Sequence, residues 1–195
     1  MEPVKTDALR ERLLSIAVKH FSQNGYAATK LSDIAHEAGV SRGPLYYYFA
    51  DKAELYTETV QYAIGQTKAE FTRIFDFSRP IAEVMRDEFN FCLSIGPQFF
   101  YQEPNVKGMP DVSPIAKAYS DWLIEKKYQL FQHAKETGQL RADCDISELI
   151  SLIYLFYHGL VQIRKLSAST NGFSPSLLEN GTDYFMKIVE ERYLA

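Results

Sequence analysis

The stretch LSDIAHEAGVSRGPLYYYFADK, residues 31–52, contains two short helical patterns joined by a glycine. In its first part, apolar residues recur with the spacing of a single helical face: Leu31, Ile34, Ala35 and Ala38. Gly39 can adopt the left-handed conformation that ends a helix. Ser41 can then cap a second helix, and Pro44 is close enough to its start to be tolerated. Two short helices joined by a tight turn are the helix-turn-helix pattern.

The expected second helix, Arg42 to Phe49, has side chains suited to DNA. In a helix-turn-helix, the N-terminal residues of the second helix enter the major groove. Arg42 can reach a guanine edge or a phosphate, and the missing side chain of Gly43 allows a close approach. Tyr46 and Tyr47 can direct phenol groups to phosphates or thymine methyls. The other apolar side chains of this helix are expected on the protein side: Leu45, Tyr48 and Phe49.

Two polar residues flank this helix and are candidates for phosphate contacts. Ser41 lies beside the first free amides of the helix, and Lys52 opens the next one. The alternative interpretation is that the aromatic run is a hydrophobic cluster between two domains. For Tyr46 and Tyr47 that interpretation leaves the surrounding order of Ser, Arg, Gly and Lys unexplained.

The remainder of the chain is predicted to be helical, so the fold class is all-α. A first amphipathic helix is expected from Thr6, as its N-cap, to Asn24-Gly25, and a long helix from Lys52 to about Phe75. Four further helices are predicted: Ile81–Ile95, Ile115–Thr137, Ile146–Leu166 and Pro175–Arg192. The proline-rich stretch from Gly96 to Pro114 is predicted to be a loop.

Composition and charge exclude several classes of protein. The 195 residues are 46% hydrophobic and 24% charged, an ordinary globular balance, and no apolar run reaches the ~20 residues of a membrane span. We therefore expect a cytoplasmic protein with no membrane partner. Residues 1–52 carry a net charge of +1 and the remainder −5, which by itself is weak support for a nucleic-acid partner.

Catalytic and metal-binding patterns are missing from the sequence. The four histidines have no metal-ligand spacing, and there is no GxSxG motif, P-loop or glycine-rich dinucleotide turn. Cys92 and Cys144 are read as reduced packing residues rather than a redox sensor. We therefore predict a protein without metal or cofactor that is not an enzyme.

The segment TKLSDIAHEAGVSRGPLYYYFADKAEL, residues 29–55, closely resembles the DNA-binding segment of the TetR/AcrR family of bacterial transcriptional regulators. The resemblance rests on the arrangement IAxxAGVSxGxLYxYFxxKxxL and extends over about residues 6–56. By position it implies DNA contacts from Thr29, Ser41, Arg42, Gly43, Tyr46, Tyr47 and Lys52, with Ser32 as a further candidate. Pro44 replaces a side chain that often reads bases in this family, so base readout is expected to rest chiefly on Arg42 and Gly43.

The resemblance also implies a domain plan and a function. Residues 1–52 would form a three-helix DNA-binding domain, with the helix-turn-helix at about 31–50, and residues 53–195 a helical ligand-binding and dimerisation domain. The implied protein is a homodimeric regulator, in the usual case a repressor that a small molecule releases from a palindromic double-stranded DNA operator.

The middle helices supply an unusually aromatic set of candidate residues for an effector pocket. These candidates are Phe89, Cys92, Phe99, Phe100, Tyr101, Tyr119, Trp122, Phe131 and Tyr154. No cationic cluster is evident, so a flat or hydrophobic small molecule is expected. The alternative is that these side chains only pack.

The segment Ile146–Leu166 is apolar on most faces, which predicts burial on two sides. In a single domain of this size, we expect the second side of this helix to pack against another subunit. The last helix is expected to take part in the same interface. The predicted interface residues are Tyr157, Val161, Leu177, Gly181, Tyr184, Phe185 and Ile188.

Two other functions remain open from the sequence. One is a helical small-molecule-binding enzyme whose helix-turn-helix is only structural. The other is a ligand-independent architectural DNA binder, which the acidic total and the aromatic second half disfavour.

Overall fold

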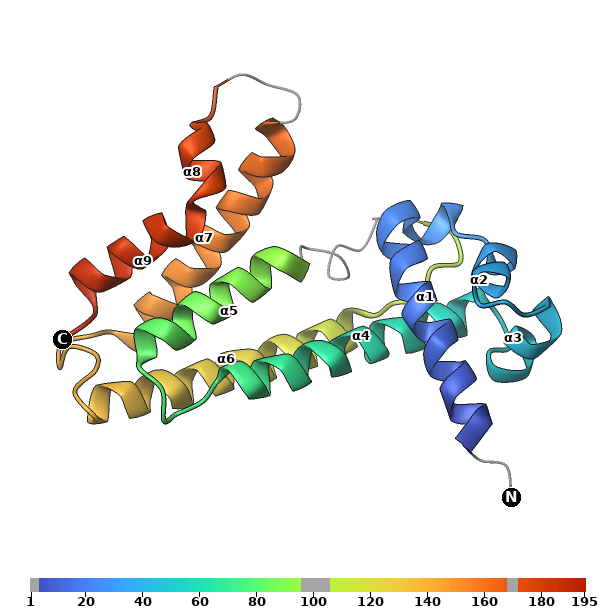
Figure 1. Cartoon of the computed structure of the whole chain (residues 1–195), viewed down its shortest axis with the longest axis horizontal. Coiled ribbons are helices and arrows are strands. Elements are labelled where there is room, and N and C mark those ends of the chain that lie inside the picture. Colours follow the sequence, from blue (N-terminus) through green and yellow to red (C-terminus); the bar gives the residue numbers. More distant parts are fainter. Residues whose placement is uncertain (1–3, 96–105, 168–171) are drawn as a thin grey trace. The chain divides into compact units, whose positions relative to one another are not determined.

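The computed structural model describes residues 4–95, 106–167 and 172–195, and within these ranges the chain is helical (Figure 1). The helices are α1 (Val4–Ala28), α2 (Leu31–Glu37), α3 (Arg42–Tyr48), α4 (Lys52–Ile74), α5 (Ile81–Ile95), α6 (Ser113–Glu136), α7 (Ile146–Ser167), α8 (Pro175–Glu179) and α9 (Gly181–Arg192). These described residues contain no strand beyond a single bridge between Leu140 and Leu194. The predicted all-α fold class is confirmed.

The chain divides by its internal contacts into two compact units. Unit 1 comprises residues 1–69 and 98–119, and unit 2 comprises residues 70–97 and 120–195. Helices α4 and α6 each contribute residues to both units. The predicted boundary between functional domains, after Lys52, stays a prediction.

The start of the first helix differs from the prediction, whereas its end agrees with it. α1 begins at Val4, so Thr6 lies inside the helix and is not its N-cap. Gly25 has a φ of 72° and a ψ of 172°, which are not helical, so the regular helix stops at the predicted Asn24-Gly25. The residues from Tyr26 to Ala28 form a separate helical turn beyond this kink.

The predicted helix Pro175–Arg192 is in fact two helices. α8 starts with Pro175 at its first turn, where the Ser174 hydroxyl accepts a hydrogen bond from the Leu177 amide. The chain leaves helical geometry at Asn180, whose φ is −107° and ψ is 28°, and α9 begins at Gly181. A Cβ on Gly181 would clash with the Leu160 side chain of α7. The glycine therefore lets the start of α9 approach α7 closely.

The core of unit 2 forms where α5 meets α7 and α9. The Phe89 ring stacks on the Phe185 ring at a centroid distance of 4.5 Å, and the Phe156 ring lies 5.4 Å from that of Phe185. Aliphatic side chains complete this buried layer: Val84, Met85, Leu149, Ile153, Met186 and Val189. Stacked and tilted aromatic pairs add to the free energy gained by burial of their apolar surface.

Helix α7 is rich in apolar residues but is only partly buried. Its segment Ile146–Arg164 has a mean hydropathy of 1.4, and 28% of it is buried. By length and composition alone, it is the one helix of the described ranges that could cross a membrane. Leu155, in the middle of the segment, is 73% exposed. Most of the other exposed residues of α7 are polar: Ser147, Glu148, Ser151, His158 and Gln162.

The close contact at Gly181 makes the glycine a requirement for packing. We expect Gly181→Ala to lower the free energy of unfolding by about 1–3 kcal/mol, because a methyl group must displace the buried Leu160 side chain. Gly65→Ala on α4 is the matched control: nothing lies within 4 Å of its added Cβ, so better helix propensity should raise stability by about 0.5–1 kcal/mol. Urea unfolding followed by circular dichroism measures both. Equal effects of the two substitutions would contradict the packing role of Gly181.

Candidate nucleic-acid interface

The turn between α2 and α3 closes with a paired set of backbone hydrogen bonds. The Val40 amide donates to the Ala35 carbonyl at 3.0 Å, and the Gly39 amide donates to the His36 carbonyl at 2.9 Å. Gly39 has a φ of 68°, the left-handed conformation that this C-terminal motif requires. The turn thus satisfies carbonyls at the end of α2 and directs the chain into α3.

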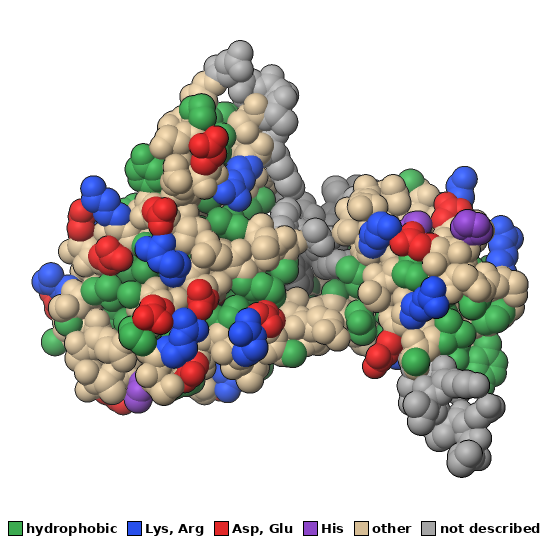
Figure 2. All heavy atoms as spheres, in the orientation of Figure 1, with side chains coloured by type: hydrophobic (Ala, Val, Ile, Leu, Met, Phe, Trp, Pro, Cys, Tyr) green, Lys and Arg blue, Asp and Glu red, His purple; other side chains and the backbone are tan. Residues whose placement is uncertain are grey.

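The direction of α3 separates its aromatic side chains into two groups. Leu45 and Phe49 are fully buried, as predicted, whereas Tyr46 is 51% exposed and Tyr47 is 77% exposed. Hydrophobic side chains are visible at the surface where α3 lies (Figure 2). Tyr48 is half-buried, with its ring 5.1 Å from that of Tyr47 in an edge contact. One face of α3 therefore anchors the helix, and the other presents two phenols to solvent.

Contacts from α1 hold the buried end of α3. The Arg10 guanidinium lies 5.8 Å over the centre of the Phe49 ring, and it also forms an ion pair with Glu58 of α4. Arg10 therefore links α1 to the end of α3 and to α4. This fixes the position of the helix whose other face is exposed.

The start of α3 presents three of the predicted DNA contacts together. Ser41 occupies the predicted N-cap position, but its hydroxyl makes no capping hydrogen bond. Arg42 and Gly43 follow it and are both exposed. A Cβ on Gly43 would meet nothing closer than Ser41 Oγ, at 3.9 Å, so packing within the described chain does not require a glycine there.

Thr29 lies beneath the surface in this structure. Its side chain is buried, and its hydroxyl lies 2.7 Å from the Gly25 carbonyl and 3.1 Å from the His20 carbonyl. The implied direct DNA contact of Thr29 stays a prediction. One of these carbonyls precedes the kink in α1 and the other belongs to the kink residue, so Thr29 is placed to position the chain between α1 and α2.

Lys52 is also engaged inside unit 1. Its ammonium donates to the Ala27 carbonyl at 3.1 Å and lies 4.7 Å over the Tyr26 ring. Partial burial lowers the pKa of Lys52 from its ordinary value. Lys52 therefore joins the start of α4 to the end of α1. Its side chain remains half-exposed, so it also borders the surface.

Aromatic packing secures this junction. The Tyr56 ring of α4 makes edge contacts with Phe21 at 5.0 Å and with Tyr26 at 5.1 Å. The Tyr26 hydroxyl donates to the Gly108 carbonyl at 2.7 Å. Burial of Tyr26 and the nearby charge of Asp51 raise its pKa, so it stays a neutral donor.

Two polar residues lie at the start of α2. Ser32, the further candidate from the family resemblance, is half-buried and donates to the Asp33 carboxylate at 3.2 Å. Lys30, which was not predicted, is exposed at the N-cap position of α2. A cation is unfavourable next to the positive end of a helix, so helix stability does not explain this lysine. That mismatch is the sequence signal that could have marked Lys30 as a candidate.

The predicted effector residues fall into several environments. Phe89 and Phe131 are fully buried, and Trp122 is half-buried. Tyr119 is buried but belongs to unit 1, whereas the other described candidates belong to unit 2. Three candidates lie outside the described residues: Phe99, Phe100 and Tyr101.

Cys92 and Tyr154 lie beside a buried ion pair that sequence reasoning missed. Glu88 and Lys127 are each 2% exposed, and the Lys127 ammonium lies 4.7 Å over the Tyr154 ring. Burial, with the charge of Glu88 adding to it, raises the pKa of Cys92 to about 12. The thiol is therefore protonated at neutral pH, as expected for a packing residue.

The predicted interface residues divide between the interior and the surface. Gly181 and Phe185 are buried against α7 and α5 of their own protomer, because Gly181 contacts Leu160 and Phe185 stacks on Phe89. Their part in an interface stays a prediction. Tyr184 and Ile188 are exposed. The others are half-buried: Tyr157, Val161 and Leu177.

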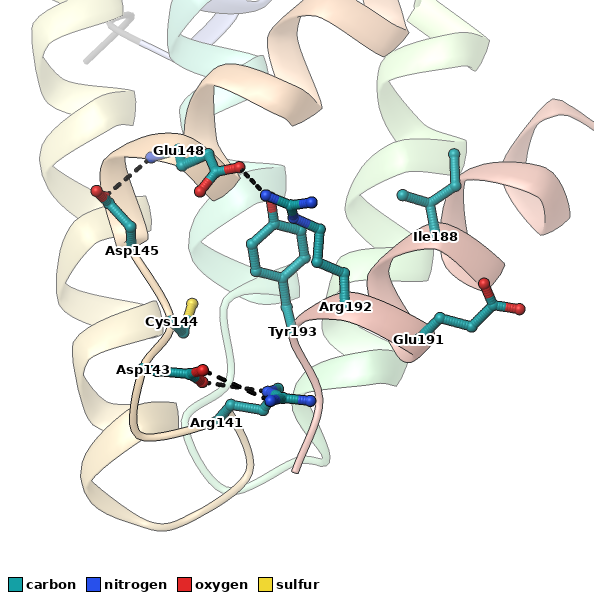
Figure 3. Close-up of a pocket in the computed structure, with 9 residues that line it drawn as sticks. All are labelled: Arg141, Asp143, Cys144, Asp145, Glu148, Ile188, Glu191, Arg192 and Tyr193. Atoms are coloured by element: carbon teal, nitrogen blue, oxygen red, sulfur yellow. Dashed lines mark hydrogen bonds and ion pairs between the residues drawn. The ribbon is translucent and has the colours of Figure 1, made fainter.

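A surface pocket of about 530 Å³ lies between the start of α7 and the end of α9 (Figure 3). It is lined by Arg141, Asp143, Cys144, Asp145, Glu148, Ile188, Glu191, Arg192 and Tyr193. None of these is a predicted effector residue. Arg192 pairs with Glu148 at 2.6 Å, Arg141 pairs with Asp143 at 3.1 Å, and the Asp145 carboxylate accepts the Ser147 amide at 2.8 Å. Both arginines are thus paired with carboxylates, and Asp145 and Glu191 leave the lining net acidic.

The part of the chain that the structure describes contains no group of three or more His, Cys, Asp or Glu side chains that could hold a metal ion. The exposed face of α3 presents a cation and two phenols together, side chains that can contact nucleic acid.

The burial of Thr29 leads to a prediction on stability. Thr29→Val keeps the shape of the side chain but removes its hydroxyl donor, so we expect unfolding to become easier by about 1–3 kcal/mol. Thr57→Val is the control, because its hydroxyl donates to a carbonyl within regular helix and its loss should change stability by less than about 0.5 kcal/mol. Thermal unfolding of the two variants distinguishes them. A fully stable Thr29→Val protein with weakened DNA binding would instead favour a direct contact.

Comparison with known proteins places the helix-turn-helix in a family. Residues 13–59 match the bacterial regulatory proteins of the tetR family. The HTH-type transcriptional regulator AcrR of Shigella flexneri is 38% identical over 69 residues, which cover 34% of this chain and 32% of that protein. A probable acrEF/envCD operon repressor of Escherichia coli K12 is 41% identical over 56 residues, or 28% of this chain and 26% of that protein. The chain thus spans about a third or less of the length of these two relatives.

Solved structures extend the likeness of fold to nearly the whole chain. A TetR transcriptional regulator from Chloroflexus aurantiacus superimposes with a TM-score of 0.76 at 21% identity, covering 98% of this chain and 99% of that one. The regulator FadR of Bacillus subtilis, solved in complex with stearoyl-CoA, gives a TM-score of 0.65 at 16% identity, covering 91% and 95%. Residues 13–59 thus match the tetR family of bacterial regulatory proteins, and the chain as a whole shares the fold of these solved TetR-family structures.

Proposed function

We propose that this chain is a homodimeric transcriptional repressor of the cytoplasm that binds a palindromic DNA operator and is released from it by a small molecule. One observation carries the proposal: α3 is anchored by fully buried Leu45 and Phe49 while its opposite face exposes Arg42, Tyr46 and Tyr47. A helix held in this way, with a cation and two phenols directed outward, suits the major groove of DNA.

Gly43 supports the same assignment, because a glycine at this position lowers the stability of the helix. A glycine within a helix is less favourable than alanine by about 0.5–1 kcal/mol, and nothing in the described chain crowds an added Cβ here. The benefit of the glycine therefore lies outside the fold. Close approach of the α3 backbone to DNA supplies that benefit.

Exposed apolar side chains on α7 and α9 support a dimer. These are Leu155 on α7, and Tyr184 and Ile188 on α9, which belong to the same unit. Because α7 packs against α5 and α8 within the unit, a second copy explains the exposure of Leu155 better than a membrane does. A two-fold dimer binds a palindrome with half-sites about one helical turn of DNA apart.

The names of the related proteins support regulation rather than catalysis. The relatives described above are named as a regulator and a repressor, and FadR is a regulator bound to an acyl-CoA. We propose that this chain likewise responds to an effector held by unit 2, and that it is not an enzyme. Coupling would run through α4, which begins with Lys52 in unit 1 and ends with residues of unit 2.

Substitutions on α3 test the DNA-binding assignment. We expect Gly43→Ala to leave folding stability unchanged or higher while lowering operator affinity at least tenfold, or about 1.4 kcal/mol, because the methyl group occupies the space of the DNA. Arg42→Ala should cost about 1–3 kcal/mol and relax the preference at one base position in each half-site. Fluorescence anisotropy with an operator selected from random DNA provides the affinities.

Gly65→Ala, which adds the same methyl group away from α3, is the control and should bind operator like the parent protein. Wild-type affinity in both Gly43→Ala and Arg42→Ala would refute the assignment of α3 as the reading helix. Equal losses by Arg42→Ala on operator and random DNA would assign Arg42 to the phosphate backbone.

Charges introduced on α7 and α9 test the dimer. We expect Leu155→Glu and Tyr184→Glu each to dissociate the dimer at micromolar concentration, because a carboxylate cannot be buried in an apolar interface without a partner. Operator affinity should fall with dimerisation. Ile124→Glu on α6, which changes a side chain of similar exposure to Tyr184, should leave both unchanged. Sedimentation velocity gives the oligomeric state, and a wild-type protein that sediments as a monomer yet binds its palindrome would contradict the arrangement.

A further inference from the structure

An ion pair is buried in the middle of unit 2, where three helices meet. Glu88 of α5 and Lys127 of α6 are each 2% exposed, and Lys127 Nζ lies 2.5 Å from Glu88 Oε1. Tyr154 of α7 supplies the third side, because its ring centre lies 4.7 Å from the Lys127 ammonium. All three residues belong to unit 2.

The carboxylate of this pair is incompletely satisfied. Among the described residues, Glu88 Oε1 is a buried side-chain oxygen without a hydrogen-bond partner of suitable geometry, despite its short distance to Lys127. A buried acceptor in this state is expected to have a partner that completes it. Replacement of a buried ion pair by apolar residues is often neutral or stabilising, so the stability of the fold alone does not account for the pair.

The surroundings of the pair are aromatic and partly accessible. Cys92 follows Glu88 by about one turn of α5, and the Tyr157 hydroxyl donates to the Cys92 carbonyl at 3.2 Å. Cys92, Tyr154 and Tyr157 are half-buried, whereas the charged pair beneath them is fully buried. An apolar wall around a few polar groups is the usual composition of a small-molecule site.

The surface pocket of Figure 3 is a weaker candidate for the effector. Its arginines are paired with Glu148 and Asp143, and its Asp145 carboxylate accepts amides at the start of α7. Both arginines and the Asp145 carboxylate therefore already have partners within the chain. Glu88 Oε1 has the Lys127 ammonium beside it but no hydrogen bond of suitable geometry.

The net charge of the pair decides what kind of molecule can complete it. Glu88 and Lys127 together carry no net charge. Burial alone would lower the pKa of Lys127, but the charge of Glu88 raises it above its ordinary value. An anionic or cationic ligand would leave one uncompensated charge in a buried place, which is strongly unfavourable. An uncharged hydroxyl can donate to Glu88 without this penalty.

We propose that Glu88 and Lys127 form the polar end of the effector site and select an uncharged apolar or aromatic molecule that carries a hydroxyl group. The inference rests on the proposed function, since it names the chemical class of the effector. Glu88 accepts the hydroxyl hydrogen, Lys127 balances the charge of the carboxylate, and Tyr154 contacts the apolar body of the ligand.

Three probes with one apolar frame test this selectivity in the full-length protein at pH 7: 2-naphthol, 2-naphthoate and 2-naphthylmethylammonium. Isothermal titration should give at least tenfold tighter binding of 2-naphthol by the wild type than of either charged probe. In Lys127→Met the uncompensated Glu88 should change the preference to the ammonium probe. In Glu88→Gln the uncompensated Lys127 should change it to 2-naphthoate.

Two further variants keep the test decisive. Glu148→Gln removes the same charge from the exposed pair with Arg192, and should retain the wild-type order of affinities. If a single variant fails to fold, as circular dichroism would reveal, the neutral double variant Glu88→Gln/Lys127→Met should fold, and it should lose at least tenfold in affinity for 2-naphthol. An unchanged order in every folded variant, an unchanged affinity of the double variant, or no binding of 2-naphthol by the wild type at millimolar concentration would overturn the proposal.

Operator binding by the same proteins separates this inference from the function on which it rests. Normal operator binding with unaltered probe selectivity would reject the polar site and leave the regulator intact. Altered probe selectivity in a protein that binds no selected DNA would support the ligand site and reject the regulator.

Discussion

The left-handed conformation of Gly39 is the constraint on which the proposed DNA-reading surface depends. It closes α2 by hydrogen bonds from Gly39 and Val40 and sets the direction in which the chain enters α3. Because α3 starts in that direction, Leu45 and Phe49 enter the core of unit 1, and Tyr46 and Tyr47 are left outside. A residue with a Cβ would strain the turn at this φ, and the orientation of α3 would be less well defined.

Unit 1 supports this helix with interactions that leave its exposed face free. Arg10 contacts Phe49 and pairs with Glu58, while Lys52 joins the start of α4 to the end of α1 at Ala27. Residues that the family resemblance assigns to DNA therefore have different parts in the structure. Arg42 and the two exposed tyrosines are presented directly, whereas Thr29 and Lys52 also hold the elements that present them.

Unit 2 combines a conventional aromatic core with one unconventional feature. Phe89, Phe156 and Phe185 pack as expected for helices that share apolar faces. Beside them, Glu88 and Lys127 are buried away from water. Buried side chains keep their charges only when a partner of opposite charge compensates them. The proposed class of effector rests on the zero net charge of this pair and on the uncharged aromatic residues around it.

The sequence by itself determined the features whose causes are local: the turn at Gly39, the two helices beside it, the all-α class and the outward direction of Tyr46 and Tyr47. Glycine conformation and helical periodicity act within a few residues, so they can be read along the chain. Only the tertiary structure decided the break at Asn180, the inward packing of Gly181 and Phe185, and the burial of Glu88 with Lys127. Each of these depends on a partner from another helix, and charged residues at helical spacing predict a solvent-exposed face until that partner is known.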